Sequence, residues 1–289
     1  MSEKHAYLIM THGNFRILEL QLKMLDDYRN DIFIHVDKKV DEFNFDYFLS
    51  ICKKAHVKFI KRRINVRWGG QTQVLTELLL FKEASKEYHS YYHLLSGVDI
   101  PLHDQDYIHD FFEGKAYNYI VCFKQDELNI WDYQRLSRFR FSPNIDARIL
   151  GRINAFQEKI NVDRLKKYDF TFTRGYNWCS LTHEAVSFLM SKEKLIVKMT
   201  RFSVCSDEVY KQLLLYNSEY RTTIYRDDTG KTDDLRLVDW QRRVKDSPHI
   251  FTFNDYEMLV SSHKLFARKF DEKVDMNIVM RLYDRVCKE

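Results

Sequence analysis

Two neighbouring acidic residues, Asp207 and Glu208, stand at the start of a segment with helical spacing, CSDEVYKQLLLYNSEY. A carboxylate held there can act as a general base that takes a proton from an attacking alcohol. One such group suffices for an inverting displacement at a sugar carbon, whereas a retaining or hydrolytic enzyme needs a second carboxylate. The alternative is structural, because Ser206 is a suitable N-cap and acidic residues are favoured in the first turn of a helix. From these residues alone, both interpretations of Glu208 are open.

Two adjacent cations, Arg268 and Lys269, could bind a phosphate group. They lie in the stretch LFARKFD between Phe266 and Phe270, which we expect to be anchored in the core. The guanidinium fork of arginine matches phosphate geometry, and lysine adds a compact charge. Together they could stabilise a departing diphosphate, whose negative charge grows in the transition state. The alternative is that both are solvated charges on an exposed turn.

A metal site is poorly supported by the sequence. The only literal Asp-x-Asp match is Asp104-Gln105-Asp106, which follows DIPLH and precedes the helical pattern YIHDFF. An aspartate in that place is typical of a helix N-cap. The second predicted strand ends in HVDKK, with lysines where a second aspartate would be needed. We therefore expect no metal and no other cofactor.

Tryptophan side chains could bind a sugar ring or a nucleobase by stacking. The chain has four: Trp68, Trp131, Trp178 and Trp240. Trp240, in VDWQRR, lies between polar residues and is the best candidate for a platform beneath an acceptor. Trp178, in GYNWCS, is predicted to lie near the cleft, where a strand begins. Each could instead be a core residue.

Two arginines, Arg135 and Arg138 in YQRLSRFRF, share one predicted helical face and could contact an acceptor. A solvated basic face is the simpler explanation of this pair.

The first hundred residues alternate strand and helix patterns that would position these groups. Strands are predicted over 5–12, 30–39, 56–60 and 90–102, and helices over 14–28, 43–55 and 72–88. This order predicts a parallel sheet with right-handed crossovers. Ligands of such sheets bind outside the carboxyl ends of the strands, which predicts a nucleotide site along a rim that holds His12, Asp37, Trp68 and Asp99.

The rest of the chain is predicted to complete one domain of 1–289. Residues 1–123 form the nucleotide-binding half, 124–170 a helical, basic and aromatic insertion on the acceptor side, and 171–289 the acceptor and catalytic half. The polar loop RDDTGKTDD is the only candidate hinge.

Composition limits the classes of protein to consider. The 289 residues are 45% hydrophobic and 15% aromatic, enough for a sizeable core, and the formal net charge is +4. A nearly neutral chain is not typical of a nucleic-acid-binding protein. Five cysteines without a CxxC pair favour a reduced, intracellular protein. The apolar run before His12 is too short for a signal peptide or a membrane span, so we expect a cytoplasmic protein, with peripheral attachment to the inner face of the membrane left open.

Taken together and in order, several stretches resemble the core-2/I-branching β-1,6-N-acetylglucosaminyltransferase family, which also includes the peptide O-xylosyltransferases. They run from about residue 5 to residue 275: HVDKK, VRWGGQTQVLTELLL, YHLLSGVDIPL, GYNWCSLTHEAVSFL, CSDEVYKQLLL, VDWQ and HKLFARKFD. The short length and missing membrane anchor look like a bacterial member. The resemblance implies a GT-A-like α/β fold, inversion and no metal.

The resemblance also implies roles for individual residues. Glu208 matches the family's base, Lys269 its diphosphate-binding lysine, and Arg268 the preceding arginine of the xylosyltransferases. Asp37 would contact the uridine, Trp68 would lie near the donor, and Trp240 would face the acceptor.

Some of the family's residues have no clear match here. Its acceptor acid and basic pair fall in 124–140, where Glu127, Arg135 and Arg138 are candidates. The second phosphate-binding arginine has no clear match, with Arg242 and Arg243 as candidates. The disulfides of the animal enzymes have no counterpart.

The predicted activity is transfer of a sugar, GlcNAc first, from a UDP-sugar to a sugar hydroxyl of a bacterial surface polysaccharide or a lipid-linked oligosaccharide, with a β linkage formed. One alternative keeps the fold with UDP-xylose, UDP-galactose or UDP-glucose as donor. Another is a non-catalytic carbohydrate-binding protein that uses its tryptophans.

Overall fold

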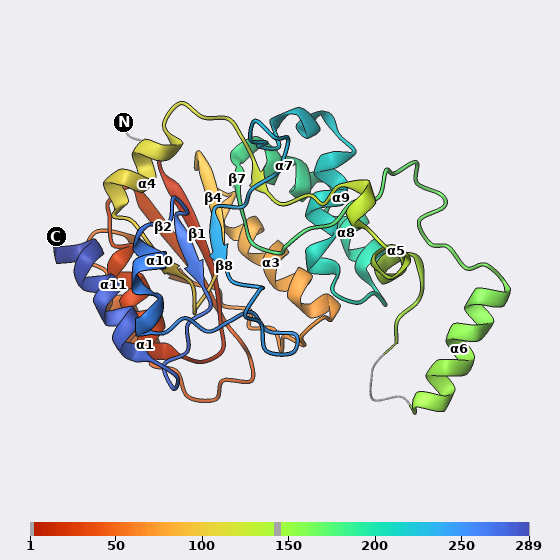
Figure 1. The fold of residues 1–289 in the computed structure, drawn as a ribbon, viewed down its shortest axis with the longest axis horizontal. Helices are drawn as coiled ribbons and strands as arrows, with labels where there is room; N and C mark the ends of the chain where they lie inside the picture. The colour runs from red at the N-terminus through yellow and green to blue at the C-terminus, as the bar shows by residue number, and fades with distance from the viewer. Residues whose placement is uncertain (1–2, 142–145, 289) are drawn as a thin grey trace.

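A sheet ordered β3-β2-β1-β4-β7-β6 forms the centre of the molecule (Figure 1). The computed structural model describes residues 3–141 and 146–288. The strands β1 to β4 pair in parallel, the shorter β7 pairs antiparallel with β4, and β6 pairs antiparallel with β7. The predicted α/β architecture with a mostly parallel central sheet is confirmed. The bounds are β1 His5–Thr11, β2 Asn30–Val36, β3 His56–Phe59, β4 Tyr91–Ser96, β6 Tyr119–Ile120 and β7 Cys179–Thr182.

Helices cover both faces of this sheet because its central strands are apolar on both sides. In β1, Ala6 and Leu8 pack into a core with α3, α7, α8 and α9, whereas Tyr7 and Ile9 pack toward α1, α2 and α4. This alternation is expected of a strand buried on both faces. The bounds are α1 Phe15–Met24, α2 Phe45–Ile51, α3 Gln71–Ala84, α4 Gln105–Phe112, α7 His183–Ser191, α8 Glu193–Thr200 and α9 Tyr210–Tyr216.

The predicted fourth strand, 90–102, is wrong in its extent. The structure ends β4 at Ser96 and starts β5 (Ile100–Pro101) in a second sheet, ordered β5-β9-β8. Between them the Asp99 carboxylate accepts hydrogen bonds from the backbone N–H and the hydroxyl of Ser96, at 2.9 and 2.7 Å. This local turn separates β4 from β5, so it is the length of the predicted strand that is wrong.

The second sheet carries the pair Arg268-Lys269. It contains β8 (Arg236–Val238) and β9 (Phe266–Arg268), and its core includes α10 (Tyr256–Val260) and α11 (Met276–Lys288). Phe266 and Phe270 are fully buried, as predicted. Arg236, also buried, donates to the carbonyl oxygens of Leu94 and Cys179 at 3.2 and 2.7 Å and so joins the two sheets.

The predicted insertion, 124–170, contains the 3-10 turn η1 (Gln125–Glu127), then α5 (Ile130–Ser137) and α6 (Ala147–Lys159). Residues 142–145, within the stretch predicted to be helical, lie outside the described residues. Figure 1 shows α6 standing apart from the body, at the end of the molecule opposite the two chain termini. Further 3-10 turns are η2 Ser206–Glu208, η3 Glu219–Thr223 and η4 Phe253–Asp255.

The helices in the described part of the chain include none with the length and apolar character needed to cross a bilayer.

Candidate active site

Glu208 lies in η2 rather than in the first turn of the following α-helix, which begins at Tyr210. The predicted N-cap is also wrong. The η2 turn follows Cys205 in a left-handed conformation, and the buried Ser206 hydroxyl has no hydrogen-bond partner among the described residues. The structural explanation of Glu208, stabilisation of a helix start, is therefore weakened. A tight turn instead presents its side chain, which is 30% exposed.

Two arginines face the Glu208 carboxylate. Arg135, from α5, contacts Oε2 at 2.5 Å, and Arg174 lies 3.9 Å from the same oxygen. Asp132 in turn lies 2.5 Å from Arg174 and 3.6 Å from Arg135. Within the described residues, Oε1 of Glu208 accepts no hydrogen bond. One carboxylate oxygen is thus oriented by cations, while the other is available to a ligand.

An irregular segment, residues 174–178 with a bend at Asn177, runs from this carboxylate toward the second sheet. Its side chains alternate: Gly175 and Asn177 are buried, whereas Arg174, Tyr176 and Trp178 are partly exposed. Arg174 lies by Glu208, the Tyr176 ring stacks on Trp240 at 5.9 Å, and Trp178 lies beneath the Arg268 guanidinium at 4.3 Å. Arg174, Tyr176 and Trp178 therefore form a row with Glu208 at one end and Arg268 at the other.

Gly175 fixes the path of this segment. A side chain there would place a Cβ 1.8 Å from the carbonyl oxygen of Val121, a distance that no packing tolerates. The Gly175 N–H also donates to the carbonyl oxygen of Glu208 at 3.0 Å. The close backbone approach requires glycine and locks the row to the η2 turn.

The two predicted phosphate-binding cations differ in their surroundings. Arg268 donates to Asp99 Oδ1 at 3.1 Å and stacks on Trp178. The Lys269 side chain is half-buried, and its ammonium has no acceptor among the described residues. Burial lowers the pKa of Lys269, and the charge of Arg268 lowers it further. A partly buried ammonium beside a second cation is an unfavourable arrangement without an anion.

The row limits how far Glu208 lies from Arg268. Four residues of chain span at most about 14 Å, so the backbones of Arg174, which lies by Glu208, and Trp178, which contacts Arg268, lie no farther apart than that. The row thus has an acid at one end and cations at the other.

A buried polar network holds the turn that carries Glu208. The Lys211 ammonium, from α9, donates to Glu77 Oε2, Asn177 Oδ1 and the Asp207 carbonyl oxygen at 2.7, 2.7 and 2.9 Å. Lys211 and Glu77 are both fully buried. Through this one cation, α3, the 174–178 segment and η2 are fixed to one another.

Asp207 belongs to the same network but points inward. Burial raises the pKa of its carboxyl to about 7, and the charges of Glu77 and Glu208 add to this effect. Gln73 donates to Oδ2 at 2.9 Å, and Oδ1 has no partner in the described part of the chain. The Asp207 side chain is therefore part of the buried network, whereas the Glu208 side chain is the one that reaches solvent.

The predicted rim holds residues with different exposure. Asp37 is buried at the end of β2, and its carboxylate accepts the N–H groups of Lys39 and Val66 at 2.8 and 3.3 Å. Asp99 is fully buried and orients the Arg268 guanidinium, so its carboxylate is already engaged within the protein. His12 is exposed just after β1.

Trp68 is also exposed, at 82%, and its turn contacts the residue that precedes η2. The carbonyl oxygen of the next residue, Gly69, accepts the N–H of Cys205 at 2.8 Å. Gly69 has φ +65°, a left-handed conformation that favours glycine. The turn thus brings Trp68 close to η2, although the two are far apart in sequence.

The predicted acceptor residues separate into two groups. Trp240 joins the row through Tyr176, whereas the Glu127 carboxylate accepts the backbone N–H of Lys124 at 2.6 Å. Arg135 is in the site as the partner of Glu208. Arg138 instead donates to the carbonyl oxygen of Gln157, at the base of α6. Its contact with an acceptor stays a prediction that this geometry does not favour.

Other charged candidates have structural partners. Arg242 lies 2.6 Å from Asp239 and 2.7 Å from Asp255, while Arg243 is exposed. Asp104 caps α4 by accepting the N–H of Tyr107 at 2.8 Å, and Asp106 pairs with Arg29 at 2.6 Å. The structural explanation of the Asp-x-Asp match is confirmed. Across residues 3–141 and 146–288, no group of three or more His, Cys, Asp or Glu side chains is placed to hold a metal ion.

Sequence reasoning missed Arg174, Tyr176 and Lys211. The first two carry a signal that could have been used: in RGYNW, large side chains alternate with small or amide residues immediately before a strand. Lys211 carries none, because a lysine at a helical position ordinarily predicts an exposed side chain.

Comparison with known proteins identifies the family. The sequence profile described as Core-2/I-Branching enzyme matches residues 5–262, which include Glu208 but not Arg268 or Lys269. A xylosyltransferase of Ciona intestinalis is 21% identical over 96% of this chain, and this chain spans 33% of that protein. The beta-glucuronosyltransferase GlcAT14B of Arabidopsis thaliana is 23% identical over 97% of this chain and 67% of its own length.

Two solved structures are similar at 10% identity. Mouse xyloside xylosyltransferase 1 has a TM-score of 0.41 and covers 92% of this chain and 97% of its own. The bifunctional glycosyltransferase WbbM has a TM-score of 0.43, with 99% and 50% covered. The match of the family profile to most of the sequence is the decisive finding: the chain belongs to the Core-2/I-Branching enzyme family of glycosyltransferases.

Proposed function

We propose that this glycosyltransferase inverts the anomeric carbon of a UDP-sugar, UDP-GlcNAc first, without a metal. The acceptor is a hydroxyl of a saccharide, either a polysaccharide or a lipid-linked oligosaccharide, and the product carries a β linkage. The observation that carries the proposal is the row Arg174-Tyr176-Trp178, which joins an oriented carboxylate to a pair of cations.

In the proposed reaction, Oε1 of Glu208 takes the proton of the acceptor hydroxyl. The hydroxyl oxygen forms a bond to the anomeric carbon as the bond from that carbon to the diphosphate oxygen breaks. Lys269, with Arg268 beside it, receives the negative charge that develops on the diphosphate. Trp178 and Asp99 hold the Arg268 guanidinium, so its position need not be organised during the reaction. The stacked rings of Tyr176 and Trp240 offer a flat surface for the acceptor sugar.

The identity of the donor is the open part of the proposal. The curated relatives are named for xylosyl and glucuronosyl transfer. UDP-xylose, UDP-galactose, UDP-glucose and UDP-glucuronate are therefore the competing donors. A non-catalytic carbohydrate-binding protein remains the alternative of another class; the ammonium of Lys269, which lacks a protein anion among the described residues, argues for a phosphate ligand instead.

The test is a thermal-shift screen of these five UDP-sugars, UDP and free sugars, with and without EDTA. A ligand at about 100 times its Kd stabilises the folded state by about 2.7 kcal/mol, which raises the midpoint by roughly 5 °C for a chain of this size. We expect UDP-GlcNAc to give the largest shift, and we expect the shift and the release of UDP to survive EDTA.

Each other result has a defined meaning. A larger shift with another UDP-sugar replaces the donor and keeps the mechanism. Shifts with free sugars and none with UDP support the binding protein. Loss of activity in EDTA with full recovery in manganese contradicts metal independence.

A further inference from the structure

The helix α6 presents an apolar stripe to solvent. Ile149, Ile153, Phe156 and Ile160 recur every three or four residues, which places them on one face of a helix. Three of them are largely exposed: Ile149 at 50%, Phe156 at 61% and Ile160 at 53%. An apolar stripe of this kind on a soluble protein marks an interaction surface.

A basic row flanks this stripe. Arg148, Arg152 and Lys159 lie together on the neighbouring face of the helix, because they are spaced four and seven residues apart, which is close to one and two helical turns. All three are exposed, and none has an ion-pair partner in the described part of the chain. An apolar stripe beside a basic face is the pattern of a helix that lies in a membrane interface.

The helix is held so that both faces stay free. Gln157, its one buried side chain among those described, exchanges hydrogen bonds with the backbone of Phe139 at 2.7 and 3.1 Å. Arg138 donates to the Gln157 carbonyl oxygen at 2.5 Å. The anchor uses the Gln157 side of α6 only, and Figure 1 shows the helix projecting from the body.

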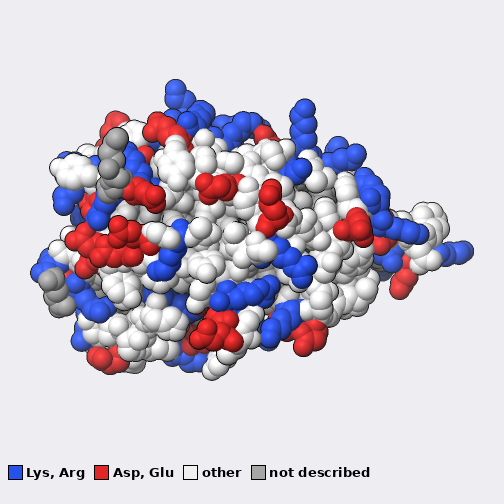
Figure 2. Space-filling model, turned by 90° about the horizontal axis from the view of Figure 1, so that it is seen from above, with Lys and Arg blue, Asp and Glu red and all other residues white. Residues whose placement is uncertain are grey.

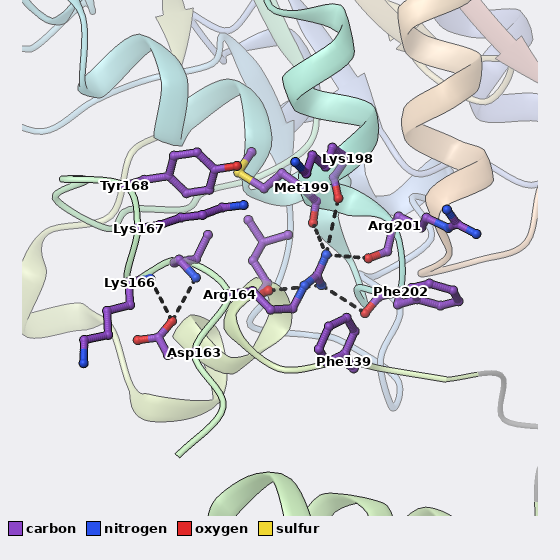
Figure 3. A pocket seen from close by; sticks show the side chains of 12 residues that line it. Phe139, Asp163, Arg164, Lys166, Lys167, Tyr168, Lys198, Met199, Arg201 and Phe202 are labelled. Carbon is purple, nitrogen blue, oxygen red and sulfur yellow. Dashed lines mark hydrogen bonds between the residues drawn. The ribbon is translucent and has the colours of Figure 1, made fainter. Parts of the chain in front are cut away.

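The basic surface continues around a cavity of about 530 Å³ (Figure 3). Lys166 and Lys167, from the chain that follows α6, line it together with Lys198 of α8 and the adjacent Arg201. Lys166, Lys167, Lys198 and Arg201 are exposed. Arg164 is the exception, because its guanidinium donates to carbonyl oxygens at the end of α8 and just beyond it, including Met199 at 3.0 Å and Arg201 at 2.7 Å.

Charge is concentrated in this part of the chain. Residues 138–168 contain eight Lys and Arg and three Asp and Glu, a net charge of +5, whereas the whole chain carries +4, so the remainder carries −1. Figure 2 shows Lys and Arg side chains along the projecting end. This positive end attracts an anionic surface. It disfavours a second copy of the chain, because a two-fold contact would bring the same cations face to face.

We infer that α6, with the basic residues that follow it, docks the enzyme on a bilayer of anionic phospholipid. The apolar stripe enters the boundary between headgroups and acyl chains, and the basic row contacts the phosphates. The inference rests on the charge and exposure of this region and does not depend on the proposed donor or reaction.

The test measures binding of the full chain to vesicles by sedimentation. One set is phosphatidylcholine, and the other is an equal mixture of phosphatidylcholine and phosphatidylglycerol. We expect binding to the anionic set only, weakened by added salt. The variant Arg148→Gln/Arg152→Gln/Lys159→Gln should bind roughly 100-fold more weakly, since each basic residue near such a surface contributes about fivefold. The variant Ile149→Ser/Ile153→Ser/Phe156→Ser should also release the protein.

Two control variants test whether the position of the substituted residues on α6 matters, rather than the loss of charge or apolar surface as such. Lys53→Gln/Lys54→Gln/Lys61→Gln removes the same charge from another exposed region, and Tyr28→Ser/Val274→Ser/Met280→Ser removes apolar surface elsewhere. Both should bind like the parent. The charge variant changes only exposed side chains, so it tests the inference even where the apolar variant fails to fold.

Three results would overturn the inference. The first is equal binding, or none, with the two vesicle types. The second is an equal loss of binding in the controls. The third is a lipid-free change of oligomeric state in the apolar variant, which would assign the stripe to a second copy of the chain.

Discussion

At the scale of single residues, Glu208 leaves one carboxylate oxygen without a partner among the described residues, because Arg135 contacts the other at 2.5 Å. A base needs a defined orientation toward the proton that it takes. Arg135 was predicted to contact the acceptor, and its observed partner assigns it a positioning role as well. The two roles are compatible, since its guanidinium has five N–H donors.

The cations at the other end of the row have separate tasks. Arg268 is already engaged by Asp99 and Trp178, whereas Lys269 has a free ammonium among the described contacts. Lys269→Ala should therefore weaken UDP binding about 10- to 100-fold, the range expected for a charge-assisted hydrogen bond. The measurement is titration calorimetry, with Lys273→Ala as a control at an exposed neighbouring lysine. Equal affinity of the Lys269→Ala variant and the parent for UDP would remove Lys269 from the phosphate site.

At the scale of elements, the Lys211 network decides where the η2 turn sits. It joins α3, through Glu77, to the segment that carries Trp178 and to the turn that carries Glu208. Breaking a fully buried ion pair typically costs 3–5 kcal/mol, because one charge is left without a partner. The network is thus both a cross-link of the fold and a support of the site.

Asp207 gives this network a dependence on pH. Its folded-state pKa of about 7 lies above its ordinary value of 3.8, so the folded state binds the proton more tightly than the unfolded state. Stability from this group is complete below about pH 4 and is lost as the pH rises to about 7, by up to about 4 kcal/mol. Asp207→Asn, which keeps an acceptor for Gln73, should flatten the fall in the free energy of unfolding across this window.

Denaturant unfolding at a series of pH values measures this effect. Asp110→Asn is the control, because Asp110 is exposed. An unchanged pH profile in the Asp207→Asn variant would mean that the Asp207 carboxyl is ionised in the folded protein.

The sequence predicted those elements that hydrophobic periodicity defines. The alternation of strands and helices in 1–123, the core positions of Phe266 and Phe270, and the cap at Asp104 follow from local patterns and are confirmed. The 90–102 strand was predicted too long because a local turn between Ser96 and Asp99 interrupts it. The Ser206 cap was wrong because the chain enters η2 through a left-handed Cys205 and leaves the Ser206 hydroxyl without a partner among the described residues. The row Arg174-Tyr176-Trp178 was missed in part, since its path is imposed by Val121 and Glu208, which are remote in sequence.

At the scale of the whole molecule, α5 and the residue at its C-terminal end contact both the site and the inferred membrane-binding helix. Arg135 contacts Glu208 from α5, and Arg138, at the C-terminal end of α5, anchors α6. A bilayer docked on α6 would lie at the end of the molecule opposite the chain termini (Figure 1).

The central claim is that one carboxylate and one pair of cations act on the same ligand from the two ends of a single row. The most direct test is Glu208→Gln, compared with the parent and with Glu219→Gln, an exposed control in the same half of the chain. Turnover is followed as UDP release from the preferred donor with acceptor present, and UDP affinity by calorimetry. The account predicts that turnover falls about 10²- to 10⁴-fold while UDP affinity and the unfolding midpoint stay the same. Near-normal turnover in Glu208→Gln would contradict it.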